Sequence, residues 1–363
     1  MDARAFHLSW LRFKWRIVKR TRYYTDRKKW VSVWERTPQY KKIWGDAARA
    51  LSAEFVELSA GVWEIRHGAS STRLYNHIVQ VDDPVVLAIA DNKPLCYEIL
   101  RKTGLPVPEF ASFRLDDMSK AKSFMEGNEG MFVVKPAHGT SGGLGITTHV
   151  RNFRDCRNAA ALASLYCPDI VIERLIPGES YRILVLSGKV IHASRRRGVR
   201  VDGDGRSTIV QLMERENQRS RGSRNRRNHP LHLSDPDIRA TLHAQRLDPG
   251  TVPGDGRSIL LKGRDDEGDR EEIRTSYNED VTALICEEIK NVAIKAAEAI
   301  DSRFAGVDII TADPVFPLAN TGGAINEVNT TPGMHNHYDL DRQNGINPAE
   351  TVLRHLLKLN PMA

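Results

Sequence analysis

The sequence predicts an α+β fold with two or three subdomains, and three observations support this prediction. The chain has 363 residues, of which 40% are hydrophobic, so it can bury a substantial core. Apolar runs separated by glycine and proline, as in 130–150 and 169–197, predict strands. Apolar positions at helical spacing, as in 277–301, predict helices in the same chain.

Residues 1–44 are predicted to form a basic, tryptophan-rich N-terminal extension. They contain 13 Lys and Arg against 3 Asp and Glu, and five of the six tryptophans. Such a segment can pack on the protein's own body or on a protein partner, bind a membrane surface, or bind nucleic acid. We favour packing, because long basic side chains can cover apolar surface. No nucleic-acid partner is expected.

The first half of the chain alternates predicted helices and strands. Residues 45–66 begin as a helix and continue as a strand. Residues 85–110 contain a buried strand, a turn and a helix, which a glycine and two prolines end. Residues 130–150 read as strand, glycine-rich loop and strand, and 169–197 as three strands joined by turns.

The second half begins with a polar stretch, 198–275, in which GDGRS occurs twice and indicates two loops before strands. A long helix is predicted over 277–301. Strands are predicted for AGVDIIT, 305–311, and AINEVN, 324–329. The closing segment NPAETVLRHLLKL is predicted to be a helix with Asn347 as its N-cap and Pro348 at its first position.

The sequence favours a cytoplasmic location. It has no apolar run of 18 or more residues and no secretory signal at its N-terminus. The four cysteines show no CxxC spacing, so we expect buried thiols rather than a disulfide or zinc framework.

Oxygen-bearing side chains near the C-terminus predict a metal site. Glu327 and Asn329 are two apart in a predicted strand and so share one face. Asp308 lies on another apolar strand, where burying an unpaired carboxylate costs several kcal/mol. A hard cation such as Mg²⁺, which prefers oxygen ligands, would remove this cost. Taken alone, the pair also fits two polar residues on a solvated strand face.

Basic side chains and glycines elsewhere predict anion binding. Lys135 ends a strand, and the glycine-rich loop that follows can turn backbone N–H groups toward phosphate. An ordinary hairpin is the alternative reading. Arg182 lies on the next pair of strands, and Arg195 and Arg197 share a face opposite to Arg196.

In this order, the segments resemble the ATP-grasp superfamily of carboxylate–amine ligases, over about residues 85–360. The resemblance is greatest to the ATP-grasp modules of cyanophycin synthetases and bifunctional glutathione synthetases. The stretches that carry it are FVVKPAHGTSGGLGI, VIERLIPGESYRILVL, GDGRSTIVQLMERENQ and AGVDII with INEVNTTPG.

This resemblance implies an ATP-grasp fold, in which a nucleotide is held between two α+β lobes, with an N-terminal α/β subdomain. The implied units are residues 45–110 for that subdomain, 111–175 for the central lobe, and 176–363 for the C-terminal lobe with an insertion at 198–275.

The resemblance also implies roles for individual residues. Lys93 and Lys135 are implied to contact the ATP phosphates. Loop 138–146 is implied to close over these phosphates, and we expect it to be mobile without nucleotide. The remaining implied nucleotide contacts are Gly139, Ser141, Gly142, Gly143, Glu173 and Leu175. Relatives place an acidic ribose-binding residue where this chain has Ser180. Glu179 or a water is the expected substitute, and Glu179 and Ser180 are both counted among the implied nucleotide-binding residues. The implied catalytic residues are Arg182, Arg196 and Asn329, and the implied metal ligands are Asp308, Glu327 and Asn329.

The implied activity is ATP-dependent joining of an amino acid or small peptide to an amine, through an acyl phosphate. ATP and Mg²⁺ are the implied cofactors, with Mn²⁺ as an alternative. A modifier of a protein or ribosomal peptide and a non-catalytic ATP-binding regulator are the competing hypotheses. We expect one anionic substrate, because Arg195, Arg197 and Arg200 crowd near the phosphoryl site. A homo-oligomer is compatible with the sequence.

Overall fold

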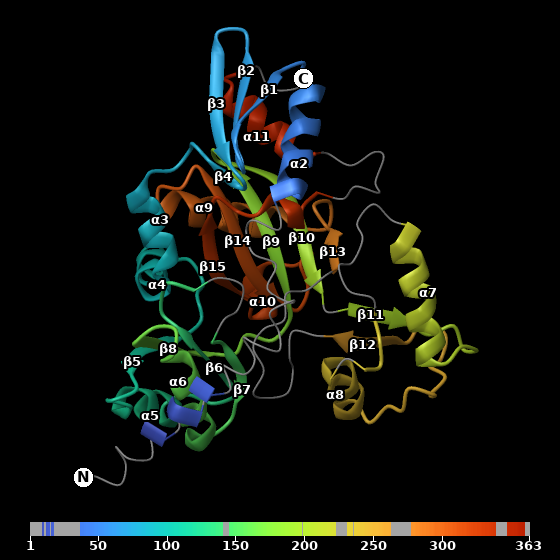
Figure 1. Ribbon diagram of the computed structural model, residues 1–363. Coiled ribbons are helices and arrows are strands. Elements are labelled where there is room, and N and C mark those ends of the chain that lie inside the picture. The colour runs from blue at the N-terminus through green and yellow to red at the C-terminus, as the bar shows by residue number, and fades with distance from the viewer. Residues whose placement is uncertain are drawn as a thin grey trace.

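The computed structural model describes residues 9, 10, 12–14, 16, 17, 37–140, 145–197, 199–222, 231–234, 236–262, 277–338 and 347–359. These residues form four sheets with helices packed on them (Figure 1). None of the described helices is long and apolar enough to cross a membrane.

A five-stranded antiparallel sheet is the centre of the molecule. Because successive side chains alternate faces, Ile183 and Val185 enter one core, whereas Leu184 and Leu186 enter another on the opposite face. Its strands are, in spatial order, β13 (Tyr277–Asp280), β10 (Lys189–Arg197), β9 (Glu179–Leu186), β14 (Phe304–Thr311) and β15 (Ala324–Thr330).

Helices cover the first of these two faces. Their apolar side chains and those of the central sheet form the largest buried cluster. The helices that contribute are α3 (Pro84–Asp91), α4 (Lys93–Lys102) and α9 (Glu287–Ala299).

The N-terminal unit and the C-terminal helix share the core on the second face (Figure 1). Trp44 is fully buried there, and its indole N–H donates to the carbonyl of Asn76 at 2.8 Å. Helix α2 runs across position 44, where the sequence suggested that the N-terminal extension ends. The elements of this unit are α2 (Thr37–Ala50), β1 (Glu54–Ser59), β2 (Val62–His67), β3 (Ser70–Tyr75), β4 (Ile78–Val79) and α11 (Pro348–Leu356).

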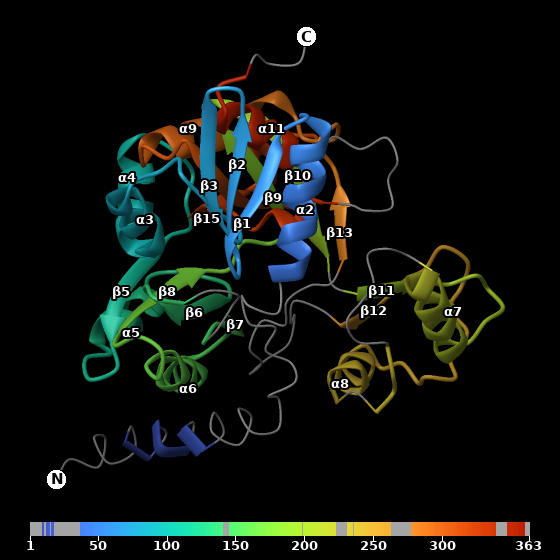
Figure 2. The same ribbon diagram turned by 45° about the horizontal axis from the view of Figure 1, so that its top comes forward.

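A second lobe contains a four-stranded antiparallel sheet, with two helices on one face. Figure 2 shows this lobe beneath the central sheet. Its opposite face carries Lys135 and its register partner Val171. The elements are, in spatial order, β5 (Phe110–Arg114), β8 (Asp169–Arg174), β6 (Phe132–Pro136) and β7 (Thr147–Val150), with α5 (Ser119–Glu126) and α6 (Phe153–Ala163).

Part of the polar stretch 198–275 folds into a small unit of its own, set to one side in Figures 1 and 2. It has a separate apolar cluster that includes Ile209, Ile238 and Leu261. The sequence predicted loops before strands here and missed both helices. The elements are β11 (Val199–Asp202), α7 (Ile209–Gly222), α8 (Pro236–Ala244) and β12 (Ser258–Lys262).

Two predictions of secondary structure were wrong. The apolar run VVLAIA is helix α3 rather than a strand, because Asp83 caps its N-terminus and Pro84 occupies its first turn. The helix predicted from residue 277 begins at Glu287, because Tyr277–Asp280 pairs with β10. Val281 and Ile285, which had suggested a helical stripe, enter the core from the connection between β13 and α9.

Several other assignments agree with the structure. The strands predicted within 130–150, 169–197, 305–311 and 324–329 are all present. Asn347 caps α11 by accepting the N–H of Ala349, and Pro348 lies at the start of that helix. Two short elements, α10 (Leu318–Thr321) and η2 (Met334–Asn336), flank β15.

Candidate active site

Three neighbouring strands of the central sheet place charged side chains side by side. Arg182 on β9 is the register partner of Asp308 on β14, which in turn is the partner of Glu327 on β15. The Nε and Nη2 atoms of Arg182 donate to the two carboxylate oxygens of Asp308 at 2.6 and 2.5 Å. Both side chains are almost completely buried. The pair is thus a bidentate, charge-assisted contact that fixes the direction of both groups.

A β-bulge next to this pair directs Glu327. Asp308 faces Glu327, whereas the next residue, Ile309, faces Ile325, so Asn326 is the extra residue in β15. Ile325 and Val328 therefore both enter the apolar core, and Glu327 points to the other face. Asn329 lies on the same face, and its Nδ2 donates to Glu327 Oε2 at 3.3 Å. The predicted common face of Glu327 and Asn329 is present.

The ammonium group of Lys93, on helix α4, lies next to Glu327. Its Nζ lies 3.3 Å from Glu327 Oε1, and the Lys93 side chain is 7% exposed. Burial alone would raise the pKa of Glu327, and so would the nearby Asp308 charge. Lys93, with Arg182 and Lys135, outweighs both, so the pKa of Glu327 lies below its ordinary value. Glu327 is accordingly an ionised carboxylate at neutral pH.

The second lobe contributes another buried ion pair. Lys135 on β6 donates to Glu173 Oε1 on β8 at 2.8 Å, and both side chains are 3% exposed. The Tyr97 hydroxyl accepts from Lys135 at 3.0 Å and lies 3.0 Å from Glu173 Oε2 and 2.5 Å from the carbonyl of Asn326. Burial, with the Glu173 charge, raises the pKa of Tyr97 well above its usual range, so the phenol stays neutral. Tyr97 thereby joins the two lobes.

The connector between β8 and β9 depends on glycine. Gly178 has φ +129°, and a Cβ there would lie 2.3 Å from the carbonyl carbon of Thr311 at the end of β14. Only glycine lets the connector pass this close to the strand. Leu175, predicted to frame adenine, donates its N–H to the carbonyl of Met131 at 2.8 Å. Glu173, predicted for the same role, accepts a hydrogen bond from Lys135 Nζ at 2.8 Å.

The start of β9 contains a buried hydroxyl. Ser180 is 3% exposed, and its Oγ has no hydrogen-bond partner among the described residues. It shares a face with Arg182, two residues later in the strand. Ser194, the register partner of Arg182 on β10, likewise has a buried Oγ with no partner in the described part of the chain. Such hydroxyls are costly to bury unless a ligand or water completes their hydrogen bonds.

Two carboxylates contact Arg195, and this bears on the anionic substrate that was predicted from the arginines of this region. Its Nη2 lies 2.6 Å from Glu279 Oε2, and its Nη1 lies 3.3 Å from Glu179 Oε2. Arg195 is therefore neutralised by the protein itself, and its position does not call for an anionic substrate. Arg200 is exposed, on β11 of the small lateral unit.

Several predicted site residues lie outside the part of the chain that the structure describes. Ser141, Gly142 and Gly143 of the glycine-rich loop are among them, as are the side chains of Arg196 and Arg197. Gly139, at the start of this loop, has φ +71° and donates its N–H to Asp91 Oδ2 at 3.0 Å.

Sequence reasoning missed Tyr97, Asp91 and Ser194. Tyr97 follows Lys93 by four residues in α4 and so lies on the same helix face, which was a usable signal. Asp91 ends α3, which had been predicted as a strand. No sequence signal identified Ser194, because its position beside Arg182 follows from the pairing of β9 with β10.

The donor set suits a hard divalent cation. Asp308 and Glu327 are carboxylates on adjacent register positions, with the Asn329 amide on the same face. Arg182 uses both oxygens of Asp308, but a carboxylate has about four lone-pair sites, so acceptor capacity remains. Asn329 would have to present Oδ1, since its nitrogen cannot bind a metal. The residues present therefore fit Mg²⁺.

Comparison with known proteins gives similarity to two kinds of synthetase. The chain is 28% identical over 317 residues to cyanophycin synthetase from Trichormus variabilis, covering 82% of this chain and 34% of that protein. It is 27% identical over 308 residues to the glutathione biosynthesis bifunctional protein GshAB of Listeria welshimeri, covering 81% of this chain and 38% of that protein. The chain thus spans about a third of the length of these relatives. No family model matches the chain.

A solved structure has a similar fold. The bifunctional glutathione synthetase from Pasteurella multocida superimposes with a TM-score of 0.60 at 21% sequence identity, covering 86% of this chain and 43% of that one. This likeness confirms the fold predicted from the sequence. The resemblance to both kinds of synthetase is confirmed as well.

Proposed function

We propose that this chain, whose fold is the ATP-grasp fold, is an ATP-dependent ligase that joins the carboxylate of an amino acid or small peptide to an amine. The similarity to cyanophycin synthetase and to bifunctional glutathione synthetases supports this reaction class. All four cysteines are free thiols, which accords with the cytoplasmic location that we propose.

The observation that carries the proposal is a group of three cation–carboxylate pairs drawn from two lobes. Lys135 pairs with Glu173, Lys93 with Glu327, and Arg182 with Asp308. Buried ion pairs contribute little net stability, because desolvation offsets their attraction. Clusters of buried charged side chains are instead typical of functional sites that bind a charged ligand, such as sites of phosphoryl transfer.

A triphosphate would compete with the carboxylates for these cations. Phosphoryl transfer requires positioning and charge neutralisation more than covalent chemistry from the protein. Lys93 and Lys135 are proposed to bind the phosphates, and Arg182 to neutralise charge that develops on the transferring group. The substrate carboxylate would leave this step as an acyl phosphate, which the amine attacks with loss of inorganic phosphate.

Asp308, Glu327 and Asn329 are proposed to hold Mg²⁺, with Mn²⁺ as an alternative. The ion, when bound, supplies positive charge against the phosphate oxygens. Arg182 holds Asp308 in place through its bidentate contact, and Lys93 keeps Glu327 ionised.

The buried hydroxyl of Ser180 supports a nucleotide contact at the start of β9. A ligand hydroxyl such as that of ribose would satisfy Oγ, which has no partner among the described residues. Glu179, the expected substitute for an acidic ribose ligand, contacts Arg195 at 3.3 Å. An anionic substrate remains a prediction, without support from Arg195.

The test is ADP release assayed with a panel of amino acids and small peptides, in acidic and neutral pairs, with and without Mg²⁺. We expect ADP and an amide product, identified by mass spectrometry, only when an acid, an amine and Mg²⁺ are all present. Glu327→Gln should fold normally and lose most turnover, because one ligand charge disappears. Glu98→Gln, an exposed change on α4, is the matched control.

Three results would overturn the proposal or a part of it. ADP release that is independent of the amine would indicate an ATPase. Wild-type turnover in Glu327→Gln at limiting Mg²⁺ would remove the metal assignment. Nucleotide binding without turnover on the whole panel would favour the regulatory alternative.

A further inference from the structure

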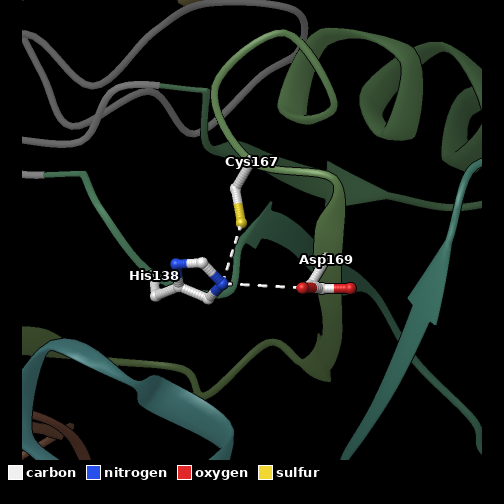
Figure 3. Close-up of side chains that lie close together, drawn as sticks. All are labelled: His138, Cys167 and Asp169. Atoms are coloured by element: carbon white, nitrogen blue, oxygen red, sulfur yellow. Dashed lines mark hydrogen bonds and ion pairs between the residues drawn. The ribbon is translucent and has the colours of Figure 1, made fainter. Parts of the chain in front are cut away.

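Three side chains capable of binding a transition metal meet where β6 leads into the glycine-rich loop. They are His138, two residues beyond β6, Cys167 between α6 and β8, and Asp169 at the start of β8. Figure 3 shows them pointing toward one another. His138 Nε2 lies 3.4 Å from Cys167 Sγ and 3.5 Å from Asp169 Oδ2.

The direction of the imidazole separates a metal site from a catalytic triad. In a Cys-His-Asp triad, the histidine uses one ring nitrogen for the nucleophile and the other for the carboxylate. Here the same nitrogen, Nε2, faces both partners. Both contacts therefore converge on one ring nitrogen instead of forming a relay.

Two of the three distances between the donor atoms match the edges of a tetrahedral zinc site. Zn–S, Zn–N and Zn–O bonds of about 2.0–2.3 Å, at tetrahedral angles, put neighbouring ligand atoms about 3.3–3.6 Å apart. The two distances from His138 Nε2, 3.4 and 3.5 Å, fall in this range. All three donor atoms lie within 4.8 Å of one another.

The surroundings hold two of the ligands in place. Asp169 accepts from Arg114 Nη1 through Oδ1 at 3.2 Å, which leaves Oδ2 toward His138. Its carbonyl accepts the N–H of Ala137 at 2.9 Å, so the backbone beside His138 is tied to the backbone of Asp169. Cys167 is 2% exposed and packs with Ala137 and Val171. An orienting partner outside the ligand shell is typical of metal sites.

We propose that His138, Cys167 and Asp169 bind one divalent transition metal ion of the Zn²⁺ class, with solvent in the fourth position. Thiolate and imidazole ligands favour this class over Mg²⁺. On binding, the Cys167 thiol proton leaves to solvent as the metal–sulfur bond forms. His138 and Asp169 are each about half exposed, so an ion can enter from solvent.

This metal site is separate from the Mg²⁺ ligands on β14 and β15. It lies beside Val171, the register partner of Lys135, and so on the face of the second lobe that carries this lysine. An ion there would tie the first residue of loop 138–146 to the start of β8. No local spacing of ligands in the sequence indicates this site, because His138 and Cys167 are 29 positions apart.

The experiment titrates the full chain with Co²⁺ alone, without nucleotide or Mg²⁺, and records the absorption spectrum. A thiolate-to-cobalt charge-transfer band should appear and should disappear when Zn²⁺ is added. Cys167→Ser should abolish the band, whereas Cys286→Ser, at a thiol outside the site, should retain it. His138→Gln and Asp169→Asn should weaken Co²⁺ binding about tenfold or more, since even partners outside the ligand shell cost about 10–100-fold.

The proposal fails if the wild-type chain gives no thiolate band, or if the band survives Cys167→Ser. It fails equally if His138→Gln binds Co²⁺ as tightly as the wild type. Because Cys167 is buried, Cys167→Ser is first compared with the wild type by thermal melting. If that variant does not fold, His138→Gln, whose side chain is 43% exposed in the wild type, decides the outcome. None of these readouts depends on ligase activity.

Discussion

The contact between Arg182 and Asp308 illustrates how one residue pair can serve both folding and chemistry. Removing one partner of a buried pair leaves an uncompensated charge, which costs about 3–5 kcal/mol. Arg182→Ala should therefore lower the free energy of unfolding by about that amount, measured by urea denaturation. Replacing both residues, as in Arg182→Met with Asp308→Leu, should recover much of the loss. Equal destabilisation of the single and double variants would show that the charge is not the cause.

Glu327 gives a prediction about pH. Its pKa is lowered in the folded chain from an ordinary 4.5, so its ionised form stabilises the fold above that pH. This contribution is lost as the pH falls through the folded-state pKa. The difference in unfolding free energy between the wild type and Glu327→Gln should therefore shrink as the pH is lowered from 7 to below 4.5. Urea denaturation across this pH range measures it, and a constant difference would contradict the assignment.

At the scale of a single element, helix α3 depends on its cap. Asp83 Oδ1 accepts the N–H groups of Val85 and Val86 at 2.8 and 3.0 Å, and Pro84 fixes the first turn. Without this cap, the apolar run VVLAIA has the composition of a buried strand. The local choice between helix and strand thus depends on the residue before the run.

Asp83→Ala should lower the free energy of unfolding by about 1 kcal/mol, the typical value of an N-cap. Asp116→Ala is the matched control, because that carboxylate is 78% exposed and caps no helix. Thermal melting of the two variants is the measurement. If both variants melt at the wild-type temperature, the cap does not stabilise α3.

At the scale of the whole molecule, two helices far apart in the sequence, α2 and α11, are built into one core. Helices α2 and α11 pack together, and their apolar side chains share one cluster with those of β2–β4 and of the central sheet. Trp44 is fully buried in this cluster. For α2, the structure supports packing on the protein's own body, one of the roles considered for the basic segment. Trp10, from the same basic segment of sequence, is 52% exposed.

These two tryptophans should respond very differently to substitution. Trp44→Ala should cost about 3–5 kcal/mol, because it empties a core site and leaves the Asn76 carbonyl without its donor. Trp10→Ala should change stability by no more than about 0.5 kcal/mol, as exposed substitutions usually do. Denaturant unfolding of both variants is the check. A comparable loss in both would mean that the N-terminal segment packs as a unit.

Much of the fold follows from local pattern. The period of two along a strand put Glu327 and Asn329 on one face, and turn residues marked the limits of β6, β8, β9 and β10. Asn347 and Pro348 identified the start of α11. These features depend on neighbours a few residues away, so the sequence alone determines them.

Only the tertiary structure determined which charged side chains contact one another. Arg182 and Asp308 are 126 positions apart, and their contact exists because β9 lies next to β14. Lys93 reaches Glu327, and His138 reaches Cys167, through packing of elements that no spacing rule connects. Side-chain type and local period are properties of the chain, whereas strand order is set by how whole elements bury their apolar faces against one another.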